Sequence, residues 1–591
     1  MKFLLIFIFT LSCASKKREA EFDVLKEVNL IDKKDESKAN TKVSKDIRSS
    51  WFSNQAKQYG LDNVKAYNFN LVDINGDNYS DLVVIPSFFS QPEFYYFSIS
   101  EKKFIKGDGP FVKPIKASYL LFYDINNDKI LDAIVGVLNQ KTELTKESLK
   151  LFLGKKDKNK NLVFDEYKNI YVPSSNSSLG LIDYNLDGHL DFYIGNWLKR
   201  ARGTAVPQHD ALILNEKGKF KDMTLLLEGE ANQNIEKSMY VNATPTYAVQ
   251  ICDIDQNGYP DILTTSTNNY HNKLWMNRYK TRSKNRIFQN TALESQFASD
   301  ENGSLNKRGG GRSFAVACTD YNNDEIMDAF IGELSHLYDN DGVDKSSILT
   351  GRTFSYPPKF YRTEYFLDST DPDSHQSDRR GVWVDYNFDG LIDLLVDNSG
   401  YPPYTKLILF EQQADHSFSN ISENLGIDII NPTATVVGDF NKDGRPDILT
   451  AQSNIRDANL KNQIYLFINQ TPTMGRKRLR VFLRGKKSNY YGLNATVKMY
   501  VKKINEEIEV RTQNVSYSYG ALPPQNEEGL FFGLQEGEEL LKFIVTWPFS
   551  DSINTFKAQL ERTYKIKTKL PDYLDITLCE EGNYLIGHRD C

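Results

Sequence analysis

Seven short stretches of the sequence share one acidic pattern, Asp-x-Asn/Asp-x-Asp/Asn-x-x-x-Asp, and each lies between two apolar runs. Side-chain oxygens at positions 1, 3 and 5, a main-chain carbonyl at position 7 and a carboxylate at position 9 can surround a calcium ion, which takes six to eight oxygen ligands. Three carboxylates in one short loop also repel one another unless a cation lies among them. The pattern therefore predicts up to seven calcium sites.

The expected ligands follow the order of these positions, with position 7 contributing its carbonyl. The first three loops supply Asp73, Asn75, Asp77, Tyr79 and Asp81, then Asp124, Asn126, Asp128, Ile130 and Asp132, then Asp183, Asn185, Asp187, His189 and Asp191. The next two supply Asp253, Asp255, Asn257, Tyr259 and Asp261, then Asp320, Asn322, Asp324, Ile326 and Asp328. The last two supply Asp385, Asn387, Asp389, Leu391 and Asp393, then Asp439, Asn441, Asp443, Arg445 and Asp447. Metal-free turn capping by Asp and Asn would explain one such loop, but seven copies with the same acidic position 9 favour metal.

Position 6 of each loop is expected to have a positive φ, which glycine adopts without strain. The suitable residues there are Gly188, Gly258, Gly390 and Gly444, with Asn78 as an acceptable substitute. Lys129 and Glu325 occupy the same position in the second and fifth loops, at a strain cost of about 1 kcal/mol. We therefore expect these two sites to bind calcium most weakly.

The apolar runs around the loops predict the fold. They are four to six residues long and rich in Val, Ile, Leu and Phe, as in buried strands, and a second pair of apolar segments follows most loops. Seven repeats of about four strands favour an all-β fold, a seven-bladed β-propeller with a small C-terminal β-rich domain. A solenoid is the alternative, but its repeats are usually shorter and need capping units.

The N-terminus has the layout of an export signal: Lys2, an apolar stretch at residues 3–11, and the small residues Ser12 and Cys13. The letters TLSC resemble a bacterial lipoprotein processing site, so residues 1–13 are expected to be a signal peptide with Cys13 lipidated. An ordinary cleaved signal is the alternative. Residues 14–50 are expected to be a charged linker. These features predict export to a bacterial cell envelope or cell surface, with membrane attachment through the lipid alone.

Four further cysteines are too few for a disulfide framework. Cys579 and Cys591 flank a short segment near the C-terminus, and a bond between them is plausible in an oxidising compartment. Cys252 and Cys318 lie in apolar runs just before two acidic loops, so we expect them to be buried free thiols.

The repeats, over about residues 60–470, resemble the FG-GAP or VCBS repeats of integrin α-subunit propellers. Residues 476–566 carry YGLNATVKMYV, SYSYGALPPQ, LFFGLQ and VTWPFSD, which resemble the ASPIC/UnbV domain of the cartilage acidic protein family and its bacterial relatives. The match is diverged, because Asn494 stands where that family usually has Gly. The resemblance implies a calcium-binding propeller at 51–474, a β domain at 475–570 and a tail at 571–591. Alternating apolar and polar residues in that β domain predict a small antiparallel sheet.

Binding is the expected activity. The formal net charge of −6 offers no basic footprint for nucleic acid, and no common catalytic motif occurs, so we do not expect an enzyme. We expect an adhesion or scaffold module for a protein or glycan ligand. The alternative is an extracellular enzyme acting on polysaccharide or a small substrate.

Long connections after the second strand of a repeat would carry ligand contacts on the face opposite the acidic loops. The longest are residues 197–210 and 335–378. The second contains Tyr338, Phe354, Tyr356, Phe360, Tyr361 and Tyr365. His209, His271 and His336 lie in the same class of connection, but surface or turn-capping roles are favoured for them.

Overall fold

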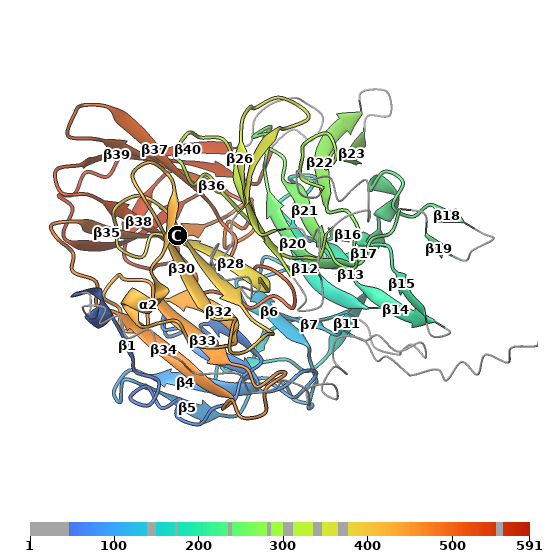
Figure 1. Ribbon diagram of the computed structural model, residues 1–591, viewed down its shortest axis with the longest axis horizontal. Coiled ribbons are helices and arrows are strands. Elements are labelled where there is room, and N and C mark those ends of the chain that lie inside the picture. Colours follow the sequence, from blue (N-terminus) through green and yellow to red (C-terminus); the bar gives the residue numbers. More distant parts are fainter. Residues whose placement is uncertain are drawn as a thin grey trace, which may run out of the picture.

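The computed structural model describes residues 47–138, 149–171, 175–201, 204–234, 239–240, 242–280, 285–298, 311–334, 345–364, 376–550 and 560–591. Cys13, most of the 14–50 linker, His336, Tyr338 and Tyr365 lie outside them. Strands dominate this part of the chain (Figure 1). Its helical turns are η2 (Ile47–Ser50), η3 (Thr224–Leu226) and α2 (Ser422–Leu425). None of the described helices has the length and apolar character that a membrane crossing requires.

Seven four-stranded antiparallel sheets follow one another along the chain. The first contains β2 (Asn68–Val72), β3 (Asp81–Ile85), β4 (Glu93–Ser98) and β5 (Lys103–Gly107); the second contains β6 (Tyr119–Tyr123), β7 (Asp132–Gly136), β8 (Leu149–Phe152) and β11 (Tyr167–Tyr171). The third contains β12 (Asn176–Ile182), β13 (Asp191–Asn196), β16 (Ala211–Glu216) and β17 (Lys219–Asp222); the fourth contains β20 (Thr246–Cys252), β21 (Asp261–Ser266), β22 (Lys273–Lys280) and β23 (Asn285–Asn290).

The fifth sheet contains β24 (Ser313–Thr319), β25 (Asp328–Glu333), β26 (Ser347–Gly351) and β27 (Phe360–Glu364); the sixth contains β28 (Asp378–Val384), β29 (Asp393–Asn398), β30 (Leu407–Gln412) and β31 (Phe418–Asn420). The seventh contains β32 (Pro432–Gly438), β33 (Asp447–Gln452), β34 (Gln463–Asn469) and β1 (Phe52–Asn54). Three small hairpins decorate these sheets: β9 (Lys155–Lys156) with β10 (Leu162–Val163), β14 (Leu198–Ala201) with β15 (Thr204–Pro207), and β18 (Gln233–Asn234) with β19 (Met239–Tyr240).

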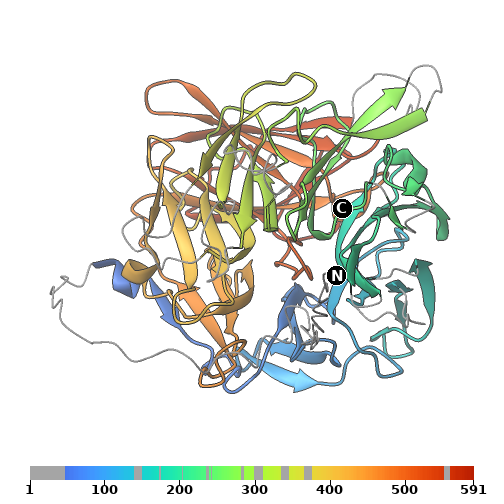
Figure 2. The same cartoon turned by 45° about the vertical axis from the view of Figure 1, so that its right-hand side comes forward.

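The seven sheets pack side by side in chain order (Figure 2). The first strand of each sheet contacts the first or second strand of the preceding sheet, and β32 of the seventh sheet contacts β2 of the first. The outer strand of the seventh sheet is β1, which comes from the N-terminal side of the first sheet and pairs with β34. The two ends of the array are thereby joined through main-chain hydrogen bonds.

Apolar clusters lie between neighbouring sheets. Val436 and Leu449 of the seventh sheet share one cluster with Phe69 and Leu71 of the first, and comparable clusters join the later pairs. The first two strands of most sheets are buried along their whole length. This explains their continuous apolar runs, because a strand covered on both faces has no polar side.

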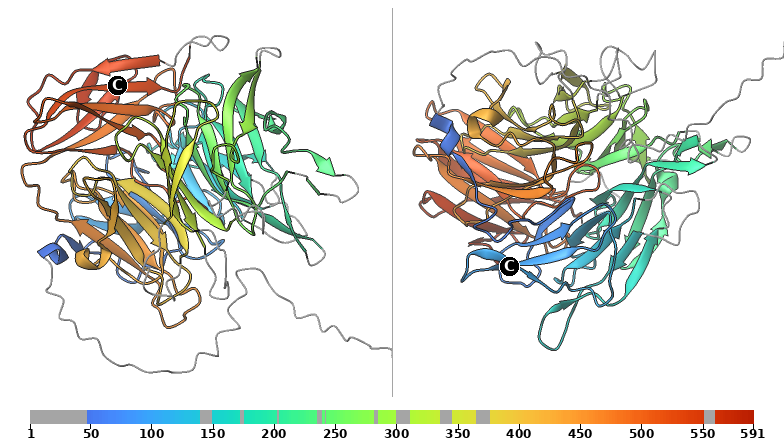
Figure 3. Two further views of the ribbon diagram at one scale, coloured as in Figure 1. Left: turned by 45° about the horizontal axis from the view of Figure 1, so that its top comes forward. Right: turned by 60° about the horizontal axis from the view of Figure 1, so that its bottom comes forward.

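The C-terminal body contains two more four-stranded sheets and packs on one end of the array (Figure 3). One sheet has β35 (Lys477–Arg484), β38 (Leu530–Leu534), β41 (Tyr573–Cys579) and β42 (Tyr584–Ile586); the other has β36 (Thr496–Lys502), β37 (Ile508–Asn514), β39 (Glu539–Trp547) and β40 (Leu560–Tyr564). Two expectations need correction here. β35 and β41 are parallel, so the domain is mixed. Residues 571–591 are not a tail, since β41 lies between β35 and β42 in its sheet.

Both cysteine pairs are bonded. Cys579 is joined to Cys591, as the sequence suggested. Cys252 and Cys318 also form a disulfide, with 6.6 Å between their Cα atoms, so the prediction of free thiols is wrong. The two cysteines are 66 residues apart, and only the contact between the neighbouring strands β20 and β24 brings them together.

The predicted insertion at 335–378 also needs correction. It contains β26 and β27, the third and fourth strands of the fifth sheet. Phe354 and Tyr356 lie in the turn between these strands, and in an antiparallel sheet that turn is at the same end as the turn between strands one and two. These aromatic side chains are therefore at the acidic-loop end of the array, and not opposite it.

Candidate functional site

The first Asp of each acidic loop organises the loop around itself by accepting main-chain hydrogen bonds. In the first loop, Oδ1 of Asp73 accepts from the N–H of Asp77 at 3.1 Å and Oδ2 accepts from the N–H of Asn78 at 2.8 Å. The same pair of bonds recurs in the other six loops. The seven loops are therefore one structural motif.

The ninth position ties each loop to the third strand of its sheet. Oδ2 of Asp81 accepts from Ile74 N–H at 3.0 Å, and Oδ1 accepts from Phe97 N–H in β4 at 2.9 Å. All seven loops repeat this arrangement, and every position-9 Asp is buried. The invariant acid at this position thus has a structural role that does not depend on metal.

Two residues of each loop have a positive φ. Position 6 does so as the sequence predicted, including Lys129 at 65° and Glu325 at 66°. Position 4 does so as well, which sequence reasoning missed; the residues are Gly76, Asn127, Leu186, Gln256, Asn323, Phe388 and Lys442. Strain at a non-glycine residue is therefore not confined to the second and fifth loops, and Leu186 and Phe388 carry it in the third and sixth.

The loops concentrate negative charge in a poorly solvated place. Burial, reinforced by the charges of Asp73 and Asp77 and opposed by two N–H bonds, raises the pKa of Asp81 to about 7. Burial and the charge of Asp255 raise the pKa of Asp253 to about 8. In every loop the first and ninth carboxyl groups have raised pKa values, with burial as the largest cause.

The donor set of these loops fits a calcium ion. The expected ligands are all oxygens, as a hard cation requires. The ninth carboxylate retains acceptor capacity, because each of its oxygens accepts one N–H and has two lone pairs. Within the described residues, carboxylate oxygens of Asp253, Asp255 and Asp261 lie within 4.8 Å of one another. Arg278 of β22 forms a 2.7 Å ion pair with Asp255 of that loop, and its positive charge partly compensates the carboxylate.

The C-terminal body lies directly on the acidic loops, a feature the sequence did not predict. Asn494 Oδ1 accepts from Asp183 N–H at 3.2 Å, and Lys498 forms a 2.8 Å ion pair with Glu325. Similar contacts reach the first, sixth and seventh loops. A Cβ atom at Gly188 would lie 2.0 Å from the carbonyl oxygen of Lys487, so glycine is needed there for space as well as for its φ of 88°.

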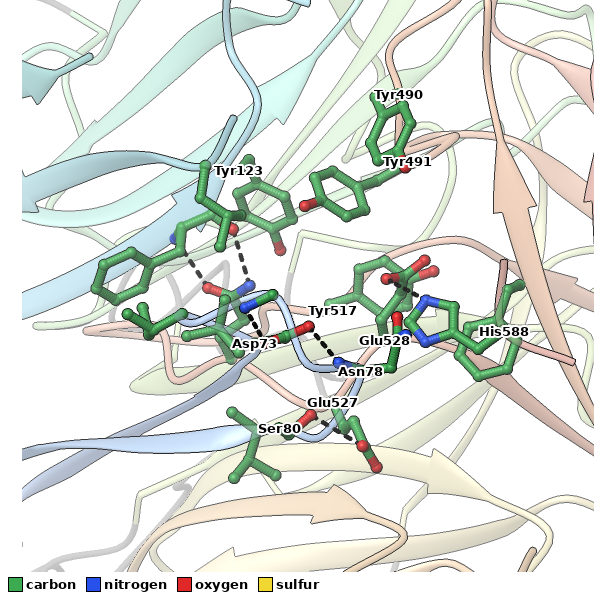
Figure 4. A pocket seen from close by; sticks show the side chains of 18 of the residues that line it. Asp73, Asn78, Ser80, Tyr123, Tyr490, Tyr491, Tyr517, Glu527, Glu528 and His588 are labelled. Carbon is green, nitrogen blue, oxygen red and sulfur yellow. Dashed lines mark hydrogen bonds and ion pairs between the residues drawn. The ribbon is translucent and has the colours of Figure 1, made fainter. Parts of the chain in front are cut away.

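A crevice of about 230 Å³ remains between the first acidic loop and the C-terminal body. Figure 4 shows Asp73 and Asn78 on one side and Tyr491, Tyr517 and Glu528 on the other. Burial raises the pKa of Glu528, but the charge of Arg484 outweighs burial and brings it to about 2. Glu528 is thus ion-paired with Arg484, and Glu527 beside it is ion-paired with Arg480 at 2.7 Å.

One connection of the C-terminal body enters the middle of the array. Residues 516–529, between β37 and β38, form this central segment. Gln525 is bonded to Phe69 and Leu71 through its main chain, and its side-chain amide forms two hydrogen bonds with the main chain of Phe122, at 2.9 and 3.0 Å. Leu522 N–H donates to Ser177 carbonyl at 2.8 Å. The central segment thus contacts the first strands of the first three sheets.

The histidines singled out in the sequence occupy separate connections. His209 Nδ1 lies 2.8 Å from the carbonyl oxygen of Asp210, and His271 is in the corresponding connection of the fourth sheet. A buried network that the sequence did not indicate lies between these sheets. Glu230 is ion-paired with Lys273 and accepts from Asp210 N–H at 3.0 Å.

Residues 385–450 match the model of an FG-GAP-like repeat. The match begins at the first Asp of the sixth loop and includes the seventh. No curated protein matches the chain.

Solved structures show only distant likeness. A Bacillus licheniformis rhamnogalacturonan lyase is 9% identical, with a TM-score of 0.35, and the alignment covers 69% of this chain and 72% of the lyase. The Vibrio cholerae biofilm matrix protein Bap1 is 9% identical, with a TM-score of 0.28 over 86% of this chain and 89% of Bap1. A putative 6-phosphogluconolactonase from Bacteroides uniformis is 7% identical, with a TM-score of 0.35 over 61% and 84%. At these scores none of them supports an assignment of function.

Proposed function

We propose that the chain is an exported, lipid-anchored binding module: a closed seven-bladed β-propeller held together by calcium, with a C-terminal domain of the ASPIC/UnbV type. It serves adhesion or scaffolding by binding a protein or glycan, and it acts through binding rather than catalysis. The observation that carries the calcium proposal is the sevenfold recurrence of the acidic loop, with a buried ninth carboxylate and a buried or half-buried first carboxylate in every copy. A divalent cation in each loop would favour the ionised carboxylates, and so oppose both the burial and the mutual repulsion that raise their pKa values.

The position of the loops gives calcium a second role in this proposal. Because the C-terminal body packs on the acidic loops, ions held there would stabilise the domain contact as well as the sheets. An open loop with three carboxylates belongs to the extracellular affinity class, with a dissociation constant of roughly 0.1 to 1 mM. Such sites are saturated outside a cell and act as staples, without switching.

Calorimetry of chelator-stripped protein titrated with calcium tests the metal sites. We expect several binding events and a rise in thermal midpoint, since each site stabilises the native state by about 2.7 kcal/mol at a hundredfold excess over its dissociation constant. Asp77→Asn removes a ligand of the first loop and should abolish one site. Asp108→Asn, an exposed acid outside the loops, is the matched control. Absence of calcium-dependent heat in the wild type would refute the proposal.

Binding through the assembled propeller is tested separately by recovery of a protein or glycan ligand with and without chelator. The proposal predicts that recovery needs calcium. Equal recovery in both conditions would show that ligand binding does not depend on the metal.

A further inference from the structure

A second, larger cavity lies at the end of the array away from the acidic loops. Its volume is about 360 Å³, within the size class of small-molecule sites. Tyr67, Arg379 and Thr433 line it from the beginnings of first strands, while the acidic loops follow the ends of those strands. Ala521 and Leu522 of the central segment close its inner side. The C-terminal body therefore leaves this end accessible and supplies the floor of the cavity.

Three arginines line this cavity, and none of its described lining residues is Asp or Glu. The guanidiniums of Arg379 and Arg456 approach each other over Gly400. A Cβ atom at Gly400 would lie 2.9 Å from Nη2 of Arg379 and 3.5 Å from Nη1 of Arg456. Both positive charges therefore lie close to the same glycine. Like charges repel each other, and an anion placed between them would reduce that cost.

The third arginine, Arg380, is buried with only 7% of its surface exposed. Its Nη2 donates to the Ala521 carbonyl at 3.0 Å, and Nη1 lies 3.4 Å from Asp397 Oδ2. Its Nε has no hydrogen-bond partner among the described residues. An unsatisfied N–H on a buried cation costs free energy, and a negative charge in the cavity would stabilise that cation.

The remaining lining suits a polyhydroxylated molecule. Ser399, Asn431 and Asn454 supply hydroxyl and amide groups, and Tyr67 and Tyr247 supply ring surface. Burial and Tyr247 raise the pKa of the Tyr67 hydroxyl, whereas the positive charges of Arg380 and Arg379 oppose the shift. Aromatic faces beside amides and hydroxyls are complementary to a sugar ring, which has both C–H and O–H surfaces.

We propose that this cavity binds the carboxylate of an acidic saccharide, a uronate, with the carboxylate held by Arg379, Arg380 and Arg456 and the sugar ring held against the tyrosines. The assignment names a ligand class for the binding module proposed above and rests on that proposal. It uses the end of the array that the C-terminal body leaves uncovered.

Calorimetry of the full chain at one fixed calcium concentration tests the assignment with three probes: galacturonic acid, a short oligogalacturonide, and the same oligosaccharide with methyl-esterified carboxyls. We expect the acidic oligosaccharide to bind and the neutral ester to bind at least tenfold more weakly. Binding of the monomer as well would identify a free sugar acid as sufficient, whereas binding of the oligomer alone would identify a polymer as the source. Equal binding of ester and acid, or binding of no probe, overturns the assignment.

Two variants locate the site. Arg456→Gln should weaken binding roughly ten- to hundredfold, as expected for loss of a charge-assisted hydrogen bond. Arg379→Gln should do the same and serves if the first variant folds poorly, which the thermal midpoint reports. Arg352→Gln, an exposed arginine in the turn between β26 and β27, is the matched control. An equal loss in the control would also overturn the assignment. Failure here with an intact calcium response would leave the metal proposal standing, so the two failures can be told apart.

Discussion

The two ends of the seven-sheet array carry side chains of opposite charge. At one end these side chains belong to a repeated local motif, and at the other they do not. At the acidic-loop end, each loop is local in sequence, its carboxylates accept main-chain N–H groups of the same repeat, and the C-terminal body covers it. At the other end, arginines from the sixth and seventh repeats gather around a cavity that remains accessible. The repeated motif thus lies where the molecule is held together, while non-repeated residues line the cavity proposed as the ligand site.

The largest effect is expected at the acidic-loop end, which the C-terminal body covers. There the Cys252–Cys318 disulfide joins the first strands of two neighbouring sheets just before their acidic loops. Replacing both cysteines by alanine should destabilise the protein by about 4 kcal/mol, because the bond closes a loop with a sequence separation of 66 residues. Chemical denaturation measures the loss. The matched pair is Cys579 and Cys591, with a separation of 12, for which about 3 kcal/mol is expected. A larger loss of unfolding free energy from removing Cys579–Cys591 than from removing Cys252–Cys318 would contradict this expectation.

The central segment links the two ends, and Gln525 is its anchor. Gln525→Glu keeps the size of the side chain but cannot donate to the Phe122 carbonyl, and it buries a charge beside the main chain of β6. We expect a loss of about 2 to 4 kcal/mol, measured by denaturation. Gln91→Glu alters an exposed glutamine in the connection between β3 and β4 and should cost less than about 0.5 kcal/mol. Equal small effects would mean that the central segment is not needed for stability.

Acid should weaken the ion pair between Glu528 of the central segment and Arg484 of β35, both in the C-terminal body. The folded-state pKa of Glu528 is about 2, below the ordinary glutamate value of 4.5. The stability that its ionised form contributes is therefore fully present above pH 4.5 and is lost as the pH falls toward 2. The contribution is on the order of 3 kcal/mol. The difference in unfolding free energy between wild type and Glu528→Gln, followed from pH 6 to pH 2.5, should shrink with acid. A difference that stays constant with pH would show that the Glu528–Arg484 ion pair does not contribute to stability in this way.

The smallest effect on stability is expected at the uncovered end. Arg456→Gln removes one 2.6 Å hydrogen bond to the Gly400 carbonyl and also relieves repulsion from Arg379. The net change in unfolding free energy should stay within about 1 kcal/mol. Thermal melts check this, with Arg352→Gln as the reference. A loss as large as that for Gln525→Glu would show that this end also holds the fold together.

Local spacing in the sequence was sufficient for the acidic loops. The positions of Asp73, Asp77 and Asp81 lie within nine residues, and the apolar runs on both sides predict the hairpin that presents them. The positive φ at position 6 also followed from the residues there. The positive φ at Leu186 and Phe388 did not, because these residue types give no local sign of a left-handed conformation.

The repeated strands, the acidic loops and the all-β class could be read from residues that are close together in the chain. Four features could not: the Cys252–Cys318 bond, the place of residues 571–591 in a sheet, the C-terminal body over the acidic loops, and the cavity shared by Arg379 and Arg456. Those contacts join residues far apart in sequence, whose proximity is set by how the sheets and the C-terminal body pack and not by any local pattern.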